Sequence, residues 1–293
     1  MQAPPEIVTI GLAKAWQPHQ PETSTMAQID DTTGAPPSDP ALLAIDGAVA
    51  TITLNRPATF NSIDLSIAKR LREFAAEVEA SDEIKVLVIE GAGRAFCAGG
   101  DLQTLGAAAA ADTIAPVVGE LLHHYHAFIA ALLRMPKIVV ASVHGSAAGA
   151  GFSLAFMADL CIAADDARFT PAYAKLGVSP DGGGTVGLTA AVGPRRALQI
   201  FLTEDHFSAA QAMQWGLVVK MVPAPELKAA TRELALRLAQ NAPSAIAATK
   251  RLIQHAPKNS IEHQLDAERD AIIDCMHTEE FRAAIGKFMQ KGK

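Results

Sequence analysis

The sequence is organised around a run of small residues that follows a buried apolar segment. Residues 138–143 read IVVASV, and the chain then passes through HGSAAGAGFS. We expect a strand there that leads into a helix start. Gly145, Gly149 and Gly151 carry no side chain that would keep a ligand from the backbone, and the first N–H groups of a helix have no partner inside it. The run therefore predicts a backbone site for negative charge, although small residues would equally let a buried helix pack closely on a sheet.

A second corner of the same kind lies nearer the N-terminus. The apolar segment 86–89 precedes RAFCAGGDL, residues 94–102, which again places small residues at an expected helix start. Each corner can offer one backbone N–H group. Two such donors directed at one oxygen form an oxyanion hole, which stabilises charge that develops on an acyl group during reaction.

Together with neighbouring motifs, the two corners resemble the crotonase family, also called the enoyl-CoA hydratase/isomerase family. The matching pieces extend from about residue 42 to the C-terminus, in order: LNRP with Asn61, FCAGGDL, HGSAAGAG, FTPAYAKLGVSPDGGGT from Phe169, and VG with Arg195 and Ala197. The last segments are most similar to enoyl-CoA isomerases and to ring-epoxide isomerases of phenylacetate breakdown. The resemblance implies an acyl-CoA thioester substrate and no separate cofactor, because coenzyme A is part of the substrate.

The composition argues against several other classes of protein. The 293 residues are 49% hydrophobic and 19% charged with a net charge of -6, which leaves no basic footprint for nucleic acid or an anionic membrane. No apolar run reaches the ~18 residues of a membrane span, and the first residues lack a signal-peptide pattern. The 3 cysteines show no metal or redox spacing. These features predict a cytoplasmic protein.

The order of the expected elements predicts an α/β fold. Residues 1–40 are rich in proline and lack periodicity, as is typical of a poorly ordered extension. Strands at 41–46 and 48–54 begin the fold, and strand and helix then alternate. The resemblance implies a crotonase-like spiral of ββα units over 41–205. The remaining region, 206–293, is expected to be helical and to join chains into a homotrimer or a dimer of trimers.

The resemblance also implies a set of site residues. The two oxyanion-hole amides belong to Gly100 and Ala150, and both roles need only a backbone N–H group. Gln103 stands where many relatives have lysine, so phosphate contacts are expected from other residues, among them Arg94. The adenine and pantetheine portions of coenzyme A are expected at Arg56, Ala58, Ala98, Asp101 and Leu102.

The two glutamates with which hydratases of this family add water have no counterparts in this chain. The resemblance places Ser153 and Tyr173 at those positions, and neither side chain is a carboxylate. Hydration by a glutamate pair is therefore not expected. Tyr173 could donate a hydrogen bond within the pocket, but we assign it to the aromatic wall of the acyl-binding site.

Asp181, within LGVSPDGGGT, is the acid to which we assign catalysis. In the family this position holds the base of enoyl-CoA isomerases and the nucleophile of an aryl-CoA dehalogenase. One carboxylate suffices for isomerisation, because it can remove a proton at one carbon and return it at another. A cap for a helix that begins near Gly184 is the competing interpretation. A hydratase with another base, a hydrolase or dehalogenase, and a non-catalytic acyl-CoA-binding homologue are the alternatives to an isomerase.

Other reactive side chains are assigned structural roles. Cys97 lies beside the first corner without an adjacent base, which favours packing over nucleophilic attack. The apolar strand end around His144 favours a hydrogen-bonded structural histidine. His123 and His126 share a helix face, but no third ligand has suitable spacing, so no metal site is expected.

Overall fold

The computed structural model describes residues 39–291, and the extension expected over residues 1–40 lies outside that range except for its last two residues. Those two belong to the folded part. The Pro40 carbonyl accepts a hydrogen bond from the Asn55 N–H at 2.8 Å, and Asp39 forms an ion pair with Arg70 at 3.0 Å. Within residues 39–291, no helix combines the length and the apolarity needed to cross a bilayer.

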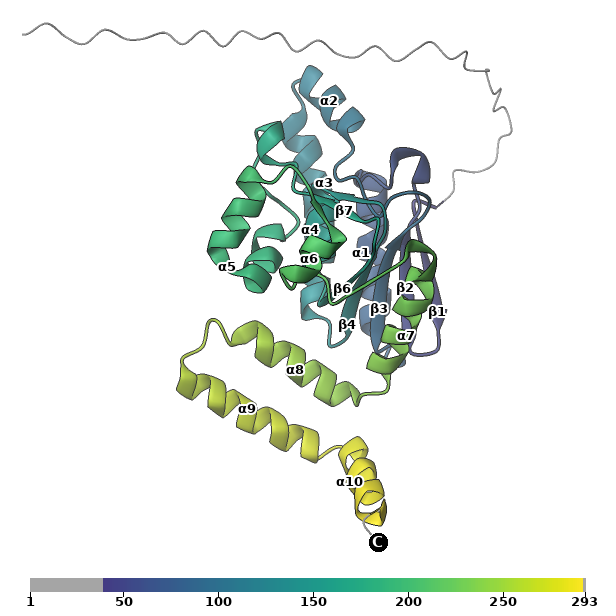
Figure 1. Ribbon diagram of the computed structural model, residues 1–293, viewed down its shortest axis with the longest axis vertical. Coiled ribbons are helices and arrows are strands. Elements are labelled where there is room, and N and C mark those ends of the chain that lie inside the picture. The colour runs from purple at the N-terminus through teal and green to yellow at the C-terminus, as the bar shows by residue number, and fades with distance from the viewer. Residues whose placement is uncertain (1–38, 292–293) are drawn as a thin grey trace, which may run out of the picture. The chain divides into compact units, whose positions relative to one another are not determined.

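Six strands form the main sheet, in the order β1-β2-β3-β4-β6-β9 (Figure 1). The first two strands are antiparallel across a tight turn in which Gly47 has a φ of 57°, and each other neighbouring pair is parallel. Parallel neighbours require crossover connections, so the alternation of strand and helix in the sequence is confirmed. The strands are β1 (Ala41–Asp46), β2 (Val49–Leu54), β3 (Val86–Gly91), β4 (Ile138–Val143), β6 (Leu160–Ala164) and β9 (Lys220–Val222).

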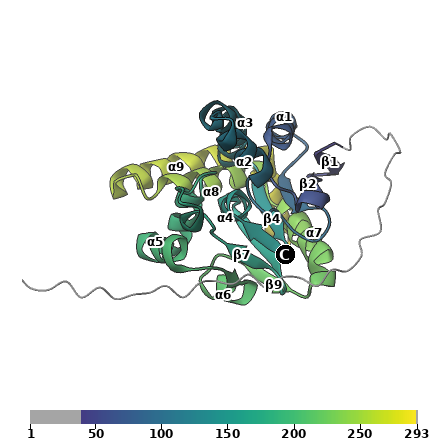
Figure 2. The same ribbon diagram turned by 90° about the horizontal axis from the view of Figure 1, so that it is seen from above.

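Both faces of this sheet are buried. In β3, Leu87 and Ile89 point into one hydrophobic cluster while Val86 and Val88 point into another, which explains the continuous apolar run. Helices α1 (Leu65–Ala80) and α3 (Ile114–Arg134) lie on one side and α7 (Leu227–Ala239) on the other (Figure 2). Both corners therefore rest on a rigid, doubly covered sheet.

A second, smaller sheet includes part of the second corner. It consists of β5 (Ser146–Ala148), β7 (Arg168–Thr170) and β8 (Phe207–Ser208), in the order β5-β7-β8. The expected direct passage from the strand at 138–143 into a helix is therefore wrong. The chain first turns at Gly145, where φ is 55°, and β5 then pairs with β7 before helix α4 (Ala150–Met157) begins.

Most helices follow the sequence pattern closely. The Asp64 carboxylate caps α1 by accepting a hydrogen bond from the Ile67 N–H at 3.0 Å, and the expected apolar stripe of this helix is buried. The first half of the alanine-rich segment 106–115 belongs to the short helix α2 (Leu102–Ala110). Helix α5 (Gly184–Thr203) kinks at Gly193 before Pro194.

The region 206–293 contains the expected helices, but its first part also contains two short strands. Strands β8 and β9 both lie beyond residue 205, and β9 pairs with β6 at the edge of the main sheet. Strands of two or three residues carry too few positions to show a period in the sequence. Helices α6 (Ala209–Gln214) and α7 also belong to this part, and α7 packs on the main sheet.

Three helices follow α7, namely α8 (Pro243–His255), α9 (Ile261–Met276) and α10 (Glu279–Lys291) (Figure 1). A buried lysine of α8 forms hydrogen bonds with α3 and with the residue that precedes β6. The Lys250 ammonium donates to the Leu132 carbonyl at 2.7 Å and to the Asp159 carboxylate at 2.8 Å. The apolar stripes expected on the last two helices are exposed in the single chain: Ile261, Leu265, Ile272, Met276, Phe281, Ile285, Phe288 and Met289.

Candidate active site

The first corner is held by the side chain of Asn61. This residue has a φ of 58°, a left-handed conformation that asparagine tolerates better than most residues. Its amide nitrogen donates to the carbonyls of Ala92 and Ala95 at 2.8 and 2.7 Å, and its oxygen accepts from the Arg56 N–H at 2.9 Å. One buried side chain therefore fixes two segments of the loop that follows β3.

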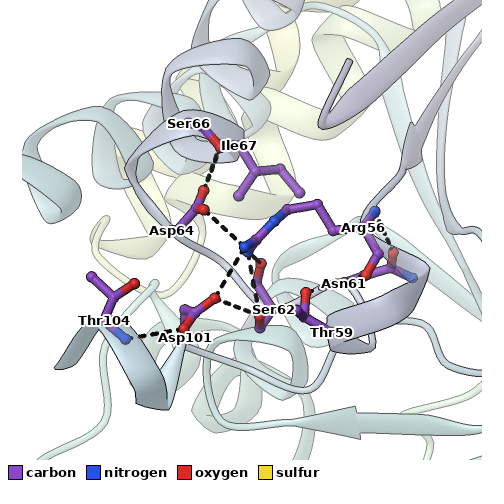
Figure 3. Close-up of polar contacts among 9 residues, drawn as sticks. All are labelled: Arg56, Thr59, Asn61, Ser62, Asp64, Ser66, Ile67, Asp101 and Thr104. Carbon is purple, nitrogen blue, oxygen red and sulfur yellow. Dashed lines mark hydrogen bonds and ion pairs between the residues drawn. The ribbon is translucent and has the colours of Figure 1, made fainter. Parts of the chain in front are cut away.

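A charged network completes the support of this corner (Figure 3). The Arg56 guanidinium pairs with Asp64 at 2.9 Å and with Asp101 at 3.1 Å. Asp101 also accepts from the Ser62 hydroxyl at 3.1 Å and caps α2 through the Thr104 N–H at 3.1 Å. Arg56, a predicted coenzyme A contact, is thus directed at two carboxylates of its own chain.

Asp101 stays ionised in spite of its burial. Burial alone would raise its pKa, but the Thr104 N–H, the Arg56 guanidinium and the Ser62 hydroxyl together hold the pKa below its usual range. Each of these donors favours the charged carboxylate. The network is therefore stable at neutral pH and fixes the residue that follows Gly100.

The two corners are in direct contact. The Cys97 N–H donates to the Ser146 carbonyl at 3.1 Å, and the Ala148 N–H donates to the Cys97 carbonyl at 2.9 Å. A Cβ atom added to Gly99 would lie 3.4 Å from the Ala150 nitrogen, and one added to Gly151 would lie 2.3 Å from the Cys97 carbonyl oxygen. The glycines thus permit an approach that a side chain would prevent.

Each corner leaves one backbone amide available. Within residues 39–291, neither the Gly100 N–H nor the Ala150 N–H donates a hydrogen bond. Their neighbours are bonded: the Ile63 N–H donates to the Gly99 carbonyl at 2.7 Å, and the Ser153 N–H donates to the Gly149 carbonyl at 3.0 Å. Ala150 is the first residue of α4, where an amide has no partner inside the helix. This arrangement offers the two donors that an oxyanion hole requires.

Asp181 lies in a polar contact that the sequence did not predict. Its Oδ1 atom accepts a hydrogen bond from the Tyr173 hydroxyl at 2.7 Å, and that hydroxyl is also 2.7 Å from the Ser153 Oγ atom of α4. The interpretation of Asp181 as a helix cap is wrong, because Gly183 is the N-cap of α5 and no side chain caps this helix. Tyr173 therefore has a polar role beyond that of an aromatic wall.

Helix α3 connects the Asp181 segment to the start of α4. The Tyr125 hydroxyl donates to the Ala150 carbonyl at 2.9 Å, and a Cβ atom added to Gly182 would lie 2.8 Å from the Tyr125 ring. The next residue of the helix, His126, accepts the Gly182 N–H at its Nε2 atom at 3.3 Å. The PDGGG segment and the start of α4 are thus both packed against the same stretch of α3.

Sequence reasoning missed both of these α3 residues. The sequence pattern places Tyr125 on an apolar helix stripe and His126 on a solvated helix face. Their partners lie 25 and 56 positions away along the chain, so no local spacing signals the contacts. A hydroxyl within an otherwise apolar stripe was the one available hint.

The predictions for Cys97 and His144 agree with the structure. Burial raises the pKa of the Cys97 thiol to about 12, so it packs as a thiol and is not a nucleophile. The His144 Nε2 atom donates to the Gly93 carbonyl at 3.0 Å, which confirms a structural histidine. Among residues 39–291, no group of three or more His, Cys, Asp or Glu side chains is arranged to hold a metal ion.

The residues expected to contact coenzyme A divide into two groups. Arg56 and Asp101 face each other in the network described above, whereas Ala58, Ala98 and Leu102 are exposed. Next to the exposed group, the Arg94 guanidinium lies 5.0 Å from the centre of the Phe60 ring. No ion pair involves Arg94 within the described part of the chain, so it is available to a phosphate group.

The two-sheet fold, with two free amides where its corners meet, defines a crotonase-type protein that acts on acyl thioesters. The family model for enoyl-CoA hydratase/isomerase matches residues 44–293, and the chain belongs to this family. The chain therefore has the fold and the enzyme class that its motifs predicted.

Known relatives within the family carry different activities. The chain is 36% identical over 248 residues to 1,2-epoxyphenylacetyl-CoA isomerase of Escherichia coli (strain K12), which covers 84% of this chain and 94% of the relative. It is 30% identical over 250 residues to trans-2-decenoyl-[acyl-carrier-protein] isomerase of Streptococcus mutans, which covers 85% and 95%. The crystal structure of an enoyl-CoA hydratase from Polaromonas sp. JS666 matches with a TM-score of 0.81 and 33% identity over 86% of this chain and 97% of that chain.

Proposed function

We propose that this protein is an isomerase of acyl-CoA thioesters that works through an enolate, with Asp181 as the proton carrier. The observation that carries the proposal is one carboxylate that accepts a hydrogen bond from Tyr173, whose hydroxyl also contacts Ser153 in the helix that supplies the Ala150 amide. Ser153 and Tyr173, at the positions of the two hydratase glutamates, supply no carboxylate to position water.

In the proposed reaction, the amides of Gly100 and Ala150 donate to the thioester oxygen. Asp181 removes a proton from the α-carbon of a 3-enoyl thioester, and the electrons of that C–H bond move into the enolate. The same carboxyl group returns the proton to the γ-carbon, the double bond moves to the 2,3 position, and the thioester is restored. Loss of one oxyanion donor typically lowers such rates by about 100- to 1000-fold. The reaction needs no cofactor besides the coenzyme A of its substrate.

The relatives include both isomerases and hydratases, and the isomerases add a second candidate substrate. Two of them are named as isomerases, one of a coenzyme A ester with an epoxide and one of a decenoyl group on acyl-carrier protein. Ring isomerisation of an epoxide-bearing aryl-CoA is therefore the second activity to assay. The exposed Arg94 favours a substrate carrier with phosphate groups.

Exposed apolar side chains support the expected assembly of several chains. The stripes of α9 and α10 reach 77% exposure at Phe288, which is unfavourable for a helix left in water. We propose that they pack between copies of this chain in a homotrimer or a dimer of trimers. This assembly would bury the face that one chain leaves open.

The test is isotope exchange in deuterated water. Purified protein is incubated with a 3-enoyl-CoA and, separately, with a 2-enoyl-CoA, and the products are analysed by mass spectrometry. We expect double-bond migration or α/γ deuterium exchange in the wild type, and loss of both in Asp181→Asn. Asp205→Asn is a matched control, because Asp205 is an exposed aspartate paired with Lys175. Hydration as the main reaction, or exchange unchanged in Asp181→Asn, would reject the proposal. Tight binding without turnover would indicate a non-catalytic homologue.

A further inference from the structure

A directed chain of hydroxyl groups runs from helix α4 to Asp181. Ser153 is fully buried and Tyr173 is 6% exposed, so neither hydroxyl exchanges its partner freely with water. The Ser153 Oγ atom lies 2.7 Å from the Tyr173 oxygen, which lies 2.7 Å from Asp181 Oδ1. Buried hydroxyls at these distances form strong hydrogen bonds, and the bond to a carboxylate is the strongest of them.

The direction of hydrogen-bond donation along these hydroxyl groups follows from their chemistry. An ionised carboxylate only accepts hydrogen bonds, so the single proton of the Tyr173 hydroxyl is donated to Asp181. Burial, and then the negative charge of Asp181, raise the pKa of Tyr173 far above its usual value, so the hydroxyl keeps this proton. Ser153 must then donate to the tyrosine oxygen. The serine stabilises the tyrosine as a donor, and the tyrosine holds the carboxylate.

This series of hydroxyl groups donates a hydrogen bond to only one oxygen of the Asp181 carboxylate. Asp181 Oδ1 accepts from Tyr173, whereas Oδ2 has no donor or ion-pair partner among residues 39–291. A carboxylate held at one oxygen cannot rotate without breaking that bond. We propose that Tyr173 is a positioning residue: its hydroxyl fixes Asp181 so that Oδ2 alone carries the proton in the reaction proposed above, on which this inference rests.

A pH profile of the activity reports on this hydrogen bond. A donor to the charged form of an acid favours that form, so removal of the donor favours the protonated acid, which cannot act as a base. The titratable groups that face the Asp181 segment are Tyr173 itself and, from α3, Tyr125 and His126. Helix α4 contributes Ser153, which does not titrate in this range.

The experiment compares variants that remove one atom each. In Tyr173→Phe we expect kcat to fall about 10- to 100-fold with little change in KM, as for a lost positioning contact. We also expect the acid limb of the pH profile of kcat/KM to move up by about one unit, as for a lost bond to a carboxylate. Ser153→Ala should move this limb in the same direction by a smaller amount, because the tyrosine donor remains.

The controls address the other groups of the site. Tyr125→Phe deletes the hydroxyl of the other tyrosine of the chain, which donates to Ala150 rather than to Asp181, and should leave the acid limb in place. His126→Gln shows whether the titration of this histidine contributes separately to the pH profile of kcat/KM. An acid limb unchanged in both Tyr173→Phe and Ser153→Ala would overturn the inference, and if Tyr173→Phe fails to fold, an unchanged Ser153→Ala profile alone overturns it.

The outcome is separable from that of the proposed function. If Asp181→Asn retains exchange, the proposed function itself fails, whatever the tyrosine does. If Asp181→Asn abolishes exchange while Tyr173→Phe matches the wild type in rate and in acid limb, the function stands and only the positioning role is lost.

Discussion

The contact between the two corners predicts a large effect of a single methyl group. Gly151 lies in α4, one residue after the Ala150 amide, and a Cβ atom added there would lie 2.3 Å from the Cys97 carbonyl oxygen and 2.8 Å from the Cys97 Sγ atom. The nearer obstacle is backbone of the first corner. Gly151→Ala must therefore separate the corners by about 1 Å to restore ordinary van der Waals distances.

Two opposing contributions determine the stability of Gly151→Ala. Replacement of glycine by alanine within a helix stabilises it by about 1 kcal/mol. Overpacking against buried backbone costs about 1–3 kcal/mol, and a contact as short as this one belongs at the upper end. We expect a net loss of about 2 kcal/mol in the free energy of unfolding. The displacement also misaligns the two oxyanion donors, and a misplacement of about 1 Å can lower kcat about 100-fold.

The assay pairs this variant with Gly119→Ala. Gly119 lies in α3 and has no atom within 4 Å of an added Cβ, so the control makes the same chemical change without a collision. It should gain about 0.5–1 kcal/mol and keep its kcat. Urea unfolding and steady-state kinetics with a 3-enoyl-CoA measure both quantities. If Gly151→Ala were as stable as Gly119→Ala and within about threefold of the wild-type kcat, contact between the corners would not control the site.

Three further predictions concern the supports of the site and its assembly. Lys250→Met leaves Asp159 without its counter-charge and should cost about 3–5 kcal/mol in urea unfolding, most of which Asp159→Asn should recover in the double variant. Because the pKa of Asp101 is held below its usual range, its stabilising contribution is complete above about pH 4 and disappears as the pH falls through its folded-state value. Asp101→Asn should therefore lose less stability between pH 7 and pH 3 than the wild type, whereas an equal loss in both would contradict the role of the Arg56 network. Phe288→Asp should reduce the mass measured by light scattering towards that of one chain, 30.7 kDa, and an unchanged mass would exclude α10 from the contact.

The sequence predicted what local patterns control. The apolar period of α1 and its Asp64 cap are confirmed, because a helix of 16 residues repeats its buried face several times. The glycine-rich corners are also confirmed, because close backbone approach leaves few residue types acceptable. Strands β8 and β9 were not predicted, because strands of two and three residues are too short to show an alternation of apolar and polar residues.

Contacts between segments that are distant in the sequence could not be predicted from local patterns. PDGGG suits a helix cap by local rules, but the Tyr173 hydroxyl binds the Asp181 carboxylate instead. Arg56 has the charge that a phosphate contact needs, yet two carboxylates far apart in the sequence surround it. The assignment of Arg56 to coenzyme A therefore stays a prediction.

The burial of two of the cysteines makes the third a natural reporter group. Cys97 and Cys161 are buried, and burial raises the pKa of both thiols to about 12, so neither supplies the thiolate that alkylating reagents attack. Cys275, on α9 near the exposed apolar stripe, is the one partly exposed thiol among the three cysteines of the sequence. A fluorescent maleimide would thus mark a single place without mutagenesis, and its labelling rate would follow how often the C-terminal helices of separate chains come apart.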